Sequence, residues 1–206
     1  MSASPGALEA SLDLGRTRSA VQAQTDRLVL PNGAAVAREA LAESFTEPED
    51  CIELTASGCR KVYLYSEHTR KYYKLYQPAE DLAPTVVIAG ATMHTIVGSD
   101  PWSDSATKVA VLPARGGECL DTCFGLGYSA HLLAEAGFQR VVSCEVDPNV
   151  LACAAVNPWS RPALEDDRVE SIEADVREIV AESADGRFSA IFHDPPTVHQ
   201  AGELYG

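Results

Sequence analysis

Four acidic residues stand where short, largely apolar runs of the second half of the chain end: Asp121, Glu145, Asp175 and Asp194. Ligands of open α/β sheets bind outside the carboxyl ends of the strands, so acids at these positions line one crevice. Glu145 follows Asp121 by 24 residues, a spacing at which a carboxylate can accept hydrogen bonds from both hydroxyls of a ribose. The sequence therefore predicts a site for a ligand that contains a nucleoside.

A glycine turn follows Asp121. Gly125 and Gly127 stand between a predicted strand and a predicted helix, where glycine lets the backbone approach a ligand and aims helix N–H groups at it. A tight turn without a ligand would use the same two glycines. The acids at the following strand ends favour the binding interpretation, and the absence of G-x-G-x-x-G argues against a dehydrogenase.

The elements that would position these residues alternate between strand and helix from Gly116 onward, which predicts a parallel sheet. The predicted strands are 118–121, 140–144, 169–173 and 188–192. A first helix is expected over 128–136. Two more open at capping residues, Asp147 before Pro148 and Asp175 before Val176.

The first half of the chain has a different character. Alternating apolar and polar residues, broken by turns such as Pro31-Asn32-Gly33, predict a small, mostly antiparallel β domain over residues 1–98, with one short helix over 37–45. Residues 99–115 are expected to form a linking helix, and 116–206 a separate α/β domain.

A basic, tyrosine-rich hairpin is predicted within this β region, with strands 60–65 and 71–76. Residues 60–76 hold five basic side chains against one acidic one, a local charge of +4. Alternation gives each strand one polar, aromatic face, made of Lys61, Tyr63 and Tyr65 and of Tyr72, Lys74 and Tyr76. Such a face suits stacking of single-stranded nucleic acid, although tyrosine also simply favours strands.

Composition limits the protein class. The net charge is −14, with four lysines among the sixteen basic residues, which resembles the acidic proteins of halophiles. At molar salt the Debye length is about 3 Å, so this charge does not exclude a nucleic-acid partner. No apolar run approaches a membrane span, the start is not a signal peptide, and we expect a cytoplasmic protein. The six cysteines lack metal-ligand spacing and are interpreted as buried apolar residues, so no metal is expected.

Residues 116–196 resemble the first four motifs of class I S-adenosylmethionine-dependent methyltransferases: GGECLDTCFGLG, VVSCEVDPN, IEADV and FHDPP. The resemblance implies that Asp121, Gly125 and Gly127 hold the methionine end of S-adenosylmethionine and Glu145 its ribose. Val146 would pack on the adenine and Asp175 would accept a hydrogen bond from the adenine amine. Cys123 departs from the family, which usually has glycine there.

Asp194-Pro195-Pro196 resembles the D/N-P-P-aromatic loop of enzymes that methylate exocyclic amines of nucleobases. There the carboxylate and a proline carbonyl accept hydrogen bonds from the amine and orient its lone pair. Thr197 replaces the aromatic residue, which weakens the expectation of base stacking. His193 and His199 flank the loop, each as an acid/base group or as a solvated side chain.

The whole chain also resembles an archaeal-type group of predicted, spermidine-synthase-like methyltransferases, through APTVVIAGATMH, DTCFGLGYSA and the HDPP and AGELY strings. A class I domain has seven strands ordered 3-2-1-4-5-7-6. This sequence supplies four, so we expect a partial Rossmann-like sheet, ordered 3-2-1-4, in a fragment or a natural short form.

The function expected from these features is methyl transfer from S-adenosylmethionine to an amine of a nucleic-acid base, with RNA favoured as partner. Two alternatives stay open: a polyamine aminopropyltransferase, against which the basic hairpin argues, and a cofactor- or RNA-binding module without turnover.

Overall fold

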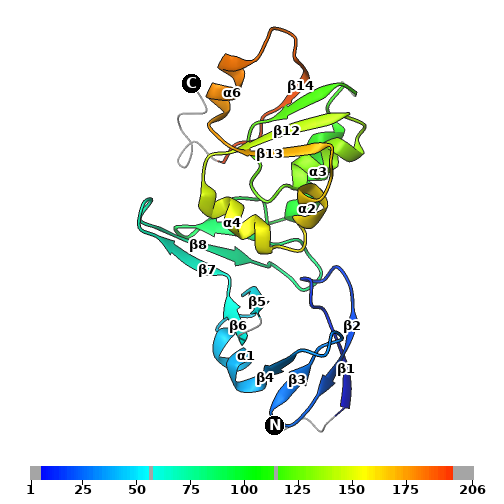
Figure 1. Cartoon of the computed structure of the whole chain (residues 1–206), viewed down its shortest axis with the longest axis vertical. Coiled ribbons are helices and arrows are strands. Elements are labelled where there is room, and N and C mark those ends of the chain that lie inside the picture. Colours follow the sequence, from blue (N-terminus) through cyan, green and yellow to red (C-terminus); the bar gives the residue numbers. More distant parts are fainter. Residues whose placement is uncertain (1–5, 56–57, 114–115, 197–206) are drawn as a thin grey trace.

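The computed structural model describes residues 6–55, 58–113 and 116–196. The molecule is elongated, with an antiparallel sheet at one end, a parallel sheet at the other and a long hairpin between them (Figure 1). None of the helices in the described ranges is long and apolar enough to cross a bilayer. Each of the six cysteines is free, and four of them are buried.

The parallel sheet contains four strands, as predicted, and its order is β13-β12-β11-β14. The strands are β11 (Glu118–Asp121), β12 (Arg140–Glu145), β13 (Val169–Glu173) and β14 (Phe188–Phe192). All three pairings are parallel, so the four carboxyl ends lie along one edge. The predicted bounds are confirmed for β11, β13 and β14. The remaining strand, β12, extends one residue further than predicted, to Glu145.

Helices cover both faces of this sheet. They are α2 (Pro101–Ala110), α3 (Tyr128–Glu135), α4 (Pro148–Val156), α5 (Arg161–Leu164) and α6 (Val176–Glu182). Alternate residues of a strand point to opposite faces. Accordingly, Cys119 and Val141 pack with α3, while Leu120 and Val142 pack with α6. Asp147 and Asp175 cap α4 and α6 through their carboxylates, as the sequence predicted.

The antiparallel sheet at the other end of the molecule has the order β1-β2-β3-β4. Its strands are β1 (Gly6–Ala10), β2 (Ser19–Ala23), β3 (Arg27–Val29) and β4 (Ala35–Ala37), followed by α1 (Arg38–Ser44). A separate antiparallel pair, β5 (Ile52–Thr55) and β6 (Gly58–Lys61), lies beside α1 (Figure 1).

A third sheet connects the two ends and has the order β10-β9-β8-β7. Its strands are β7 (Tyr63–Ser66), β8 (Lys71–Tyr76), β9 (Thr85–Ile88) and β10 (Ala91–Thr92). The predicted single strand over 60–65 is wrong, because residues 58–61 pair with β5 whereas 63–66 pair with β8. The chain changes partner at Val62, whose N–H donates to Cys51 and whose carbonyl accepts from Leu75.

The hydrophobic core extends across residue 98, where the sequence predicts a domain boundary. Tyr73, Leu75 and Val86 of the third sheet belong to the same buried cluster as Leu133 of α3 and Val150 of α4. The division of the chain remains a prediction. The shared core fixes the third sheet against the parallel sheet, and this contact forms one wall of the site described below.

Candidate cofactor and acceptor site

A cavity of about 960 Å³ lies between the third sheet and the carboxyl edge of the parallel sheet. Its size is in the range of small-molecule and cofactor sites. One wall comes from β9, β10 and the following turn, including Val86, Ile88 and His94. The opposite wall comes from the loops after the four parallel strands. Both walls are needed to enclose it.

Most of the predicted cofactor and acceptor residues line this cavity. Those on its wall are Gly125, Glu145, Val146, Asp175, Asp194, Pro195 and Pro196. Asp121 and Gly127 are not among the lining residues. The structure thus brings together residues spread over seventy positions of sequence, as expected for strand ends that share one edge.

Glu145 holds the glycine turn through its carboxylate. Oε2 accepts a hydrogen bond from the Gly125 N–H at 2.9 Å, and Oε1 accepts one from the Asp147 N–H at 3.0 Å. Burial raises the pKa of Glu145, and the two backbone donors act against this rise. The carboxylate therefore fixes the turn and still has lone pairs free to face the cavity.

Gly125 is the glycine that needs its conformation for the cavity. Its φ is +55°, and the atom nearest to an added Cβ would be His94 Nε2, at 3.9 Å. A ligand can therefore lie against the backbone there. Gly127 is required for packing instead, since a Cβ there would lie 2.6 Å from the Phe124 ring. This close approach explains Gly127 without a ligand.

Asp121 lies beneath the turn and is only 1% exposed. Its Oδ2 accepts hydrogen bonds from Ser143 at 2.7 Å and Ser129 at 3.0 Å, while Oδ1 has no partner among the described residues. Burial raises the pKa of Asp121 to about 7, although the two serine hydroxyls lower it. Its position indicates that it supports β12 and α3 under the cavity.

The end of the cavity at β12 and β13 presents Val146, which is 67% exposed, and Asp175. The Asp175 carboxylate accepts from the Arg177 N–H at 2.9 Å and pairs with the Arg177 guanidinium. This guanidinium lowers the pKa of Asp175 to about 2. An apolar side chain beside an ionised acceptor suits a flat, polar-edged ring such as adenine.

Asp194 lies at the opposite end and is held by Lys108 of α2. The Lys108 ammonium donates to Oδ1 at 2.9 Å and to Oδ2 at 2.7 Å, and it also pairs with Asp104 at 2.9 Å. Burial lowers the pKa of Lys108, but these two carboxylates raise it above its usual value. Lys108 and Asp104 both line the cavity, and the sequence analysis identified neither as a site residue.

His193 does not line the cavity. Its Nδ1 lies 2.9 Å from the Thr122 hydroxyl, and the residue borders a separate apolar depression beside Val180 and Ile191. His199 lies outside the described residues. Among the described residues, the histidine on the cavity wall is His94, which the sequence analysis did not select because nothing local to it indicates a ligand.

The tyrosines predicted to share one face of the hairpin do so on β7 and β8, but Lys61, predicted on the same face, lies in β6, which pairs with β5. Tyr63 faces Lys74, and Tyr65 faces Tyr72. The Tyr72 ring stacks on Tyr63, with centroids 5.3 Å apart, and lies 4.7 Å from Tyr65. These three side chains are exposed, whereas Tyr73, which points the other way, is fully buried.

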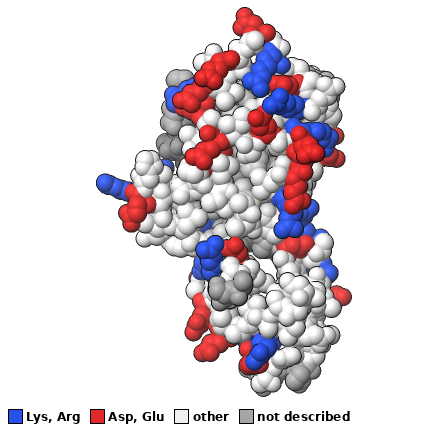
Figure 2. Space-filling model, viewed as in Figure 1, with Lys and Arg blue, Asp and Glu red and all other residues white. Residues whose placement is uncertain are grey.

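The basic charge of the hairpin is partly neutralised in the fold. Arg60 pairs with Glu53 at 2.6 Å, and Lys61 pairs with Asp50 at 2.6 Å. Lys74 remains on the tyrosine face, 5.3 Å from the Tyr76 ring. On the face shown in Figure 2, acidic and basic side chains intermingle over the parallel-sheet end, and the hairpin tip carries both signs.

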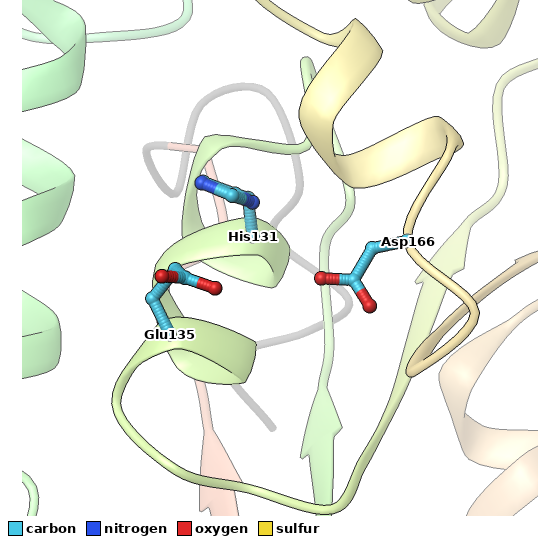
Figure 3. A group of neighbouring side chains, drawn as sticks. All are labelled: His131, Glu135 and Asp166. Carbon is cyan, nitrogen blue, oxygen red and sulfur yellow. The ribbon is translucent and has the colours of Figure 1, made fainter.

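A group of possible metal ligands lies away from the cavity. His131 and Glu135 of α3 and Asp166 have ligand atoms within 4.8 Å of one another (Figure 3). The guanidinium of Arg168 donates to Glu135 at 2.6 Å and to Asp166 at 2.7 and 2.9 Å. A bound cation there would have to displace this arginine, so the group is best described as an ion-pair cluster.

The chain is similar in fold to known structures. Spermidine synthase from Thermotoga maritima aligns with a TM-score of 0.52 and 17% identity, over 77% of this chain and 59% of that one. Spermidine synthase in complex with the transition-state analogue AdoDATO aligns at 0.51 and 18%, over 75% and 58%. At such identity the likeness shows a shared fold. The C-terminal domain of a precorrin-6Y methyltransferase from Rhodobacter capsulatus scores 0.38, too low to support an argument.

One curated relative is similar in sequence. The uncharacterized protein MJ1233 of Methanocaldococcus jannaschii is 36% identical over 135 residues, which are 65% of this chain and 45% of that protein. The chain thus spans less than half the length of the relative it matches. No protein-family model matches the sequence.

Proposed function

We propose that the chain binds S-adenosylmethionine in the 960 Å³ cavity and transfers its methyl group to an amine of a nucleic-acid base, with RNA as the favoured substrate. The observation that carries the proposal is that three strand-end acids, Glu145, Asp175 and Asp194, line one cavity wall. Gly125, whose φ is positive and which has no side chain, leaves space for a ligand beside them. When bound, S-adenosylmethionine supplies an electrophilic methyl group on a sulfonium.

The residues present fit this cofactor. Glu145 offers carboxylate lone pairs to a ribose, and Val146 with Asp175 offers an apolar surface and an acceptor to an adenine. Gly125 leaves room for the methionyl part beside the backbone. Asp121 would act from beneath, by holding Ser129 and Ser143 in place.

The acceptor end favours a neutral amine. Lys108 already pairs with Asp194 and Asp104, so a cationic diamine that used these carboxylates would have to compete with an ammonium that makes three hydrogen bonds or ion pairs at 2.7–2.9 Å. The exocyclic amine of a nucleobase is uncharged and needs only an acceptor oxygen and a proline carbonyl to orient it. We assign these roles to Asp194, Pro195 and Pro196, which line the cavity.

The tyrosine face supports a nucleic-acid substrate, in a role separate from the chemistry. Tyr63, Tyr65 and Tyr72 project from the side of the hairpin opposite to Tyr73 and Lys71, and Lys71 lines the cavity. A base stacked on these rings is therefore a flanking base, while the target base enters the cavity.

Binding and transfer distinguish this proposal from its alternatives. Calorimetry with S-adenosylmethionine tests the cofactor. Transfer of a labelled methyl group to single-stranded RNA, read by mass spectrometry of the nucleosides, tests the acceptor. Cofactor binding without transfer to RNA, DNA or any other amine would favour a binding module without turnover, and no binding would remove the proposal.

The aminopropyltransferase alternative rests on the shared fold with spermidine synthase, which aligns with 77% of this chain. The discriminating measurement is aminopropyl transfer from decarboxylated S-adenosylmethionine to a diamine. Appearance of a triamine would replace the methyltransferase proposal, and it would also overturn the argument from the Lys108 ion pairs.

A further inference from the structure

His94 follows β10 and reaches into the cavity between the glycine turn and α3. Its Nε2 lies 3.9 Å from the position of a Cβ built on Gly125, and its ring centroid is 5.5 Å from that of Tyr128. Tyr128 is itself fixed, because its hydroxyl donates to the Pro84 carbonyl at 2.8 Å and accepts from Asn157 at 2.9 Å. The imidazole is therefore held between two rigid elements.

The hydrogen bonds around Thr85 favour one of the two neutral tautomers of the His94 imidazole. The Thr85 hydroxyl donates to the Val86 carbonyl at 3.2 Å, which uses its one hydrogen, and it accepts from the His94 backbone N–H at 3.2 Å. With that hydrogen directed at Val86, the 3.0 Å contact between the hydroxyl and His94 Nδ1 has Nδ1–H as the donor, and we infer this tautomer. Nε2 is left with a bare lone pair that faces the cavity.

The charge state agrees with this assignment. Burial lowers the pKa of His94 to about 4, against the opposing effects of Asp194 and Asp104, while Lys108 lowers it further. Asp104 and Lys108 of α2 and Asp194 of the loop after β14 are the charged side chains of these two elements that face the imidazole. At neutral pH His94 is an uncharged hydrogen-bond acceptor.

The order of the sheet decides which part of a ligand His94 would meet. Asp175 follows β13, Glu145 ends β12, the glycine turn follows β11 and Asp194 follows β14, in that spatial order. If the ribose lies at Glu145 and the adenine beside Asp175, the remaining part of the cofactor extends toward the glycine turn and Asp194. His94 stands at that junction of donor and acceptor.

We propose that His94 recognises the positively charged methyl donor, by directing the uncharged Nε2 lone pair of its imidazole at the sulfonium end of the cofactor. This inference rests on the proposed function. An Nε2–H or a cation at this point would oppose the sulfonium, whereas the thioether product S-adenosylhomocysteine carries no charge there. His94 is thus a specificity-determining residue that lets the site distinguish donor from product.

The test compares the two ligands in charge-altered variants. In His94→Lys a permanent charge lies near the sulfonium, and we expect S-adenosylmethionine to bind at least about tenfold more weakly relative to S-adenosylhomocysteine than in the unaltered protein. His94→Gln keeps an uncharged acceptor oxygen in place of Nε2 and should change the ratio of the two dissociation constants by less than about threefold, whereas His94→Leu removes the acceptor and should lower the preference for S-adenosylmethionine by more than about threefold. Calorimetry gives both constants for each variant.

A second measurement reads the tautomer directly. Nitrogen-15 NMR of the histidine rings should show hydrogen on Nδ1 of His94 at neutral pH, and Thr85→Val, which removes the acceptor for that hydrogen, should shift the population toward Nε2–H. Equal weakening of both ligands in His94→Lys, or an Nε2–H imidazole in the unaltered protein, overturns the proposal. Failure of the unaltered protein to bind either ligand overturns the proposed function and this inference with it.

Discussion

Glu145→Ala should damage both the cofactor site and the turn that builds it. The carboxylate accepts from the Gly125 N–H at 2.9 Å and the Asp147 N–H at 3.0 Å, and hydrogen bonds to a charged group contribute about 1.5–3 kcal/mol each. Because the site is partly open, water can satisfy one of the two donors after truncation. We therefore expect the free energy of unfolding to fall by about 1.5–3 kcal/mol, the contribution of one such bond.

The same change should weaken S-adenosylmethionine binding by about 1.5–3 kcal/mol, or roughly 10- to 150-fold, because the ribose loses a charged acceptor. Glu145→Gln should have an affinity between those of the unaltered protein and Glu145→Ala. Its amide keeps one acceptor oxygen but turns an NH₂ group toward a backbone N–H.

Calorimetry measures the affinity, and urea unfolding measures the stability. Glu173→Ala is the matched control: this exposed glutamate ends the neighbouring strand β13, and its loss should change either quantity by less than about 0.5 kcal/mol. A Glu145→Ala protein that loses stability but binds the cofactor with unchanged affinity would show that the carboxylate serves the turn alone.

Three further outcomes are expected. Asp194→Ala should leave cofactor affinity nearly unchanged while methyl transfer is lost; normal transfer by this variant would remove Asp194 from the acceptor site. Tyr72→Ala should weaken single-stranded RNA binding by about 1–3 kcal/mol without changing cofactor affinity. Because the Tyr72 ring contacts Tyr65, replacing both tyrosines with alanine should cost less binding free energy than the sum of the two single changes. Additive losses would contradict binding of RNA on one surface shared by the two rings. Burial would raise the pKa of Asp50, but Lys61 and nearby N–H groups lower it to about 2, so its stabilisation is present above its ordinary pKa of 3.8 and is lost as pH falls toward 2. Asp50→Asn should flatten unfolding stability over that range, and an unchanged acid limb in urea titrations would refute this.

The parallel half of the fold could be predicted closely because its elements are encoded locally. Strand 188–192 is a short apolar run, and α4 begins where Asp147 caps it and Pro148 supplies its first residue, as the sequence indicated. Such signals depend on neighbours within a few positions. Predicting that the strand-end acids lie together required one further rule, that the carboxyl ends of parallel strands share one edge of the sheet. Glu145 and Asp175 do lie together on the cavity wall.

The strand from 60 to 65 shows where local patterning fails. Alternation continues through this segment, but residues 58–61 and 63–66 pair with different strands. Pairing partners are chosen by the packing of whole sheets, and period-two alternation is the same for either partner.

The sequence by itself determined the residue types, the helix caps and the positions of the acids along the chain. Only the tertiary structure decided which of them act together. Lys108 meets Asp194 across 86 positions, Tyr73 meets Asp147 across 74, and His94 reaches Gly125 from a different sheet. These contacts exist because one hydrophobic core joins the third sheet to α3 and α4. The free energy gained by burying that shared apolar surface comes from many residues far apart in the sequence. A local sequence pattern therefore does not predict which polar side chains this core brings together.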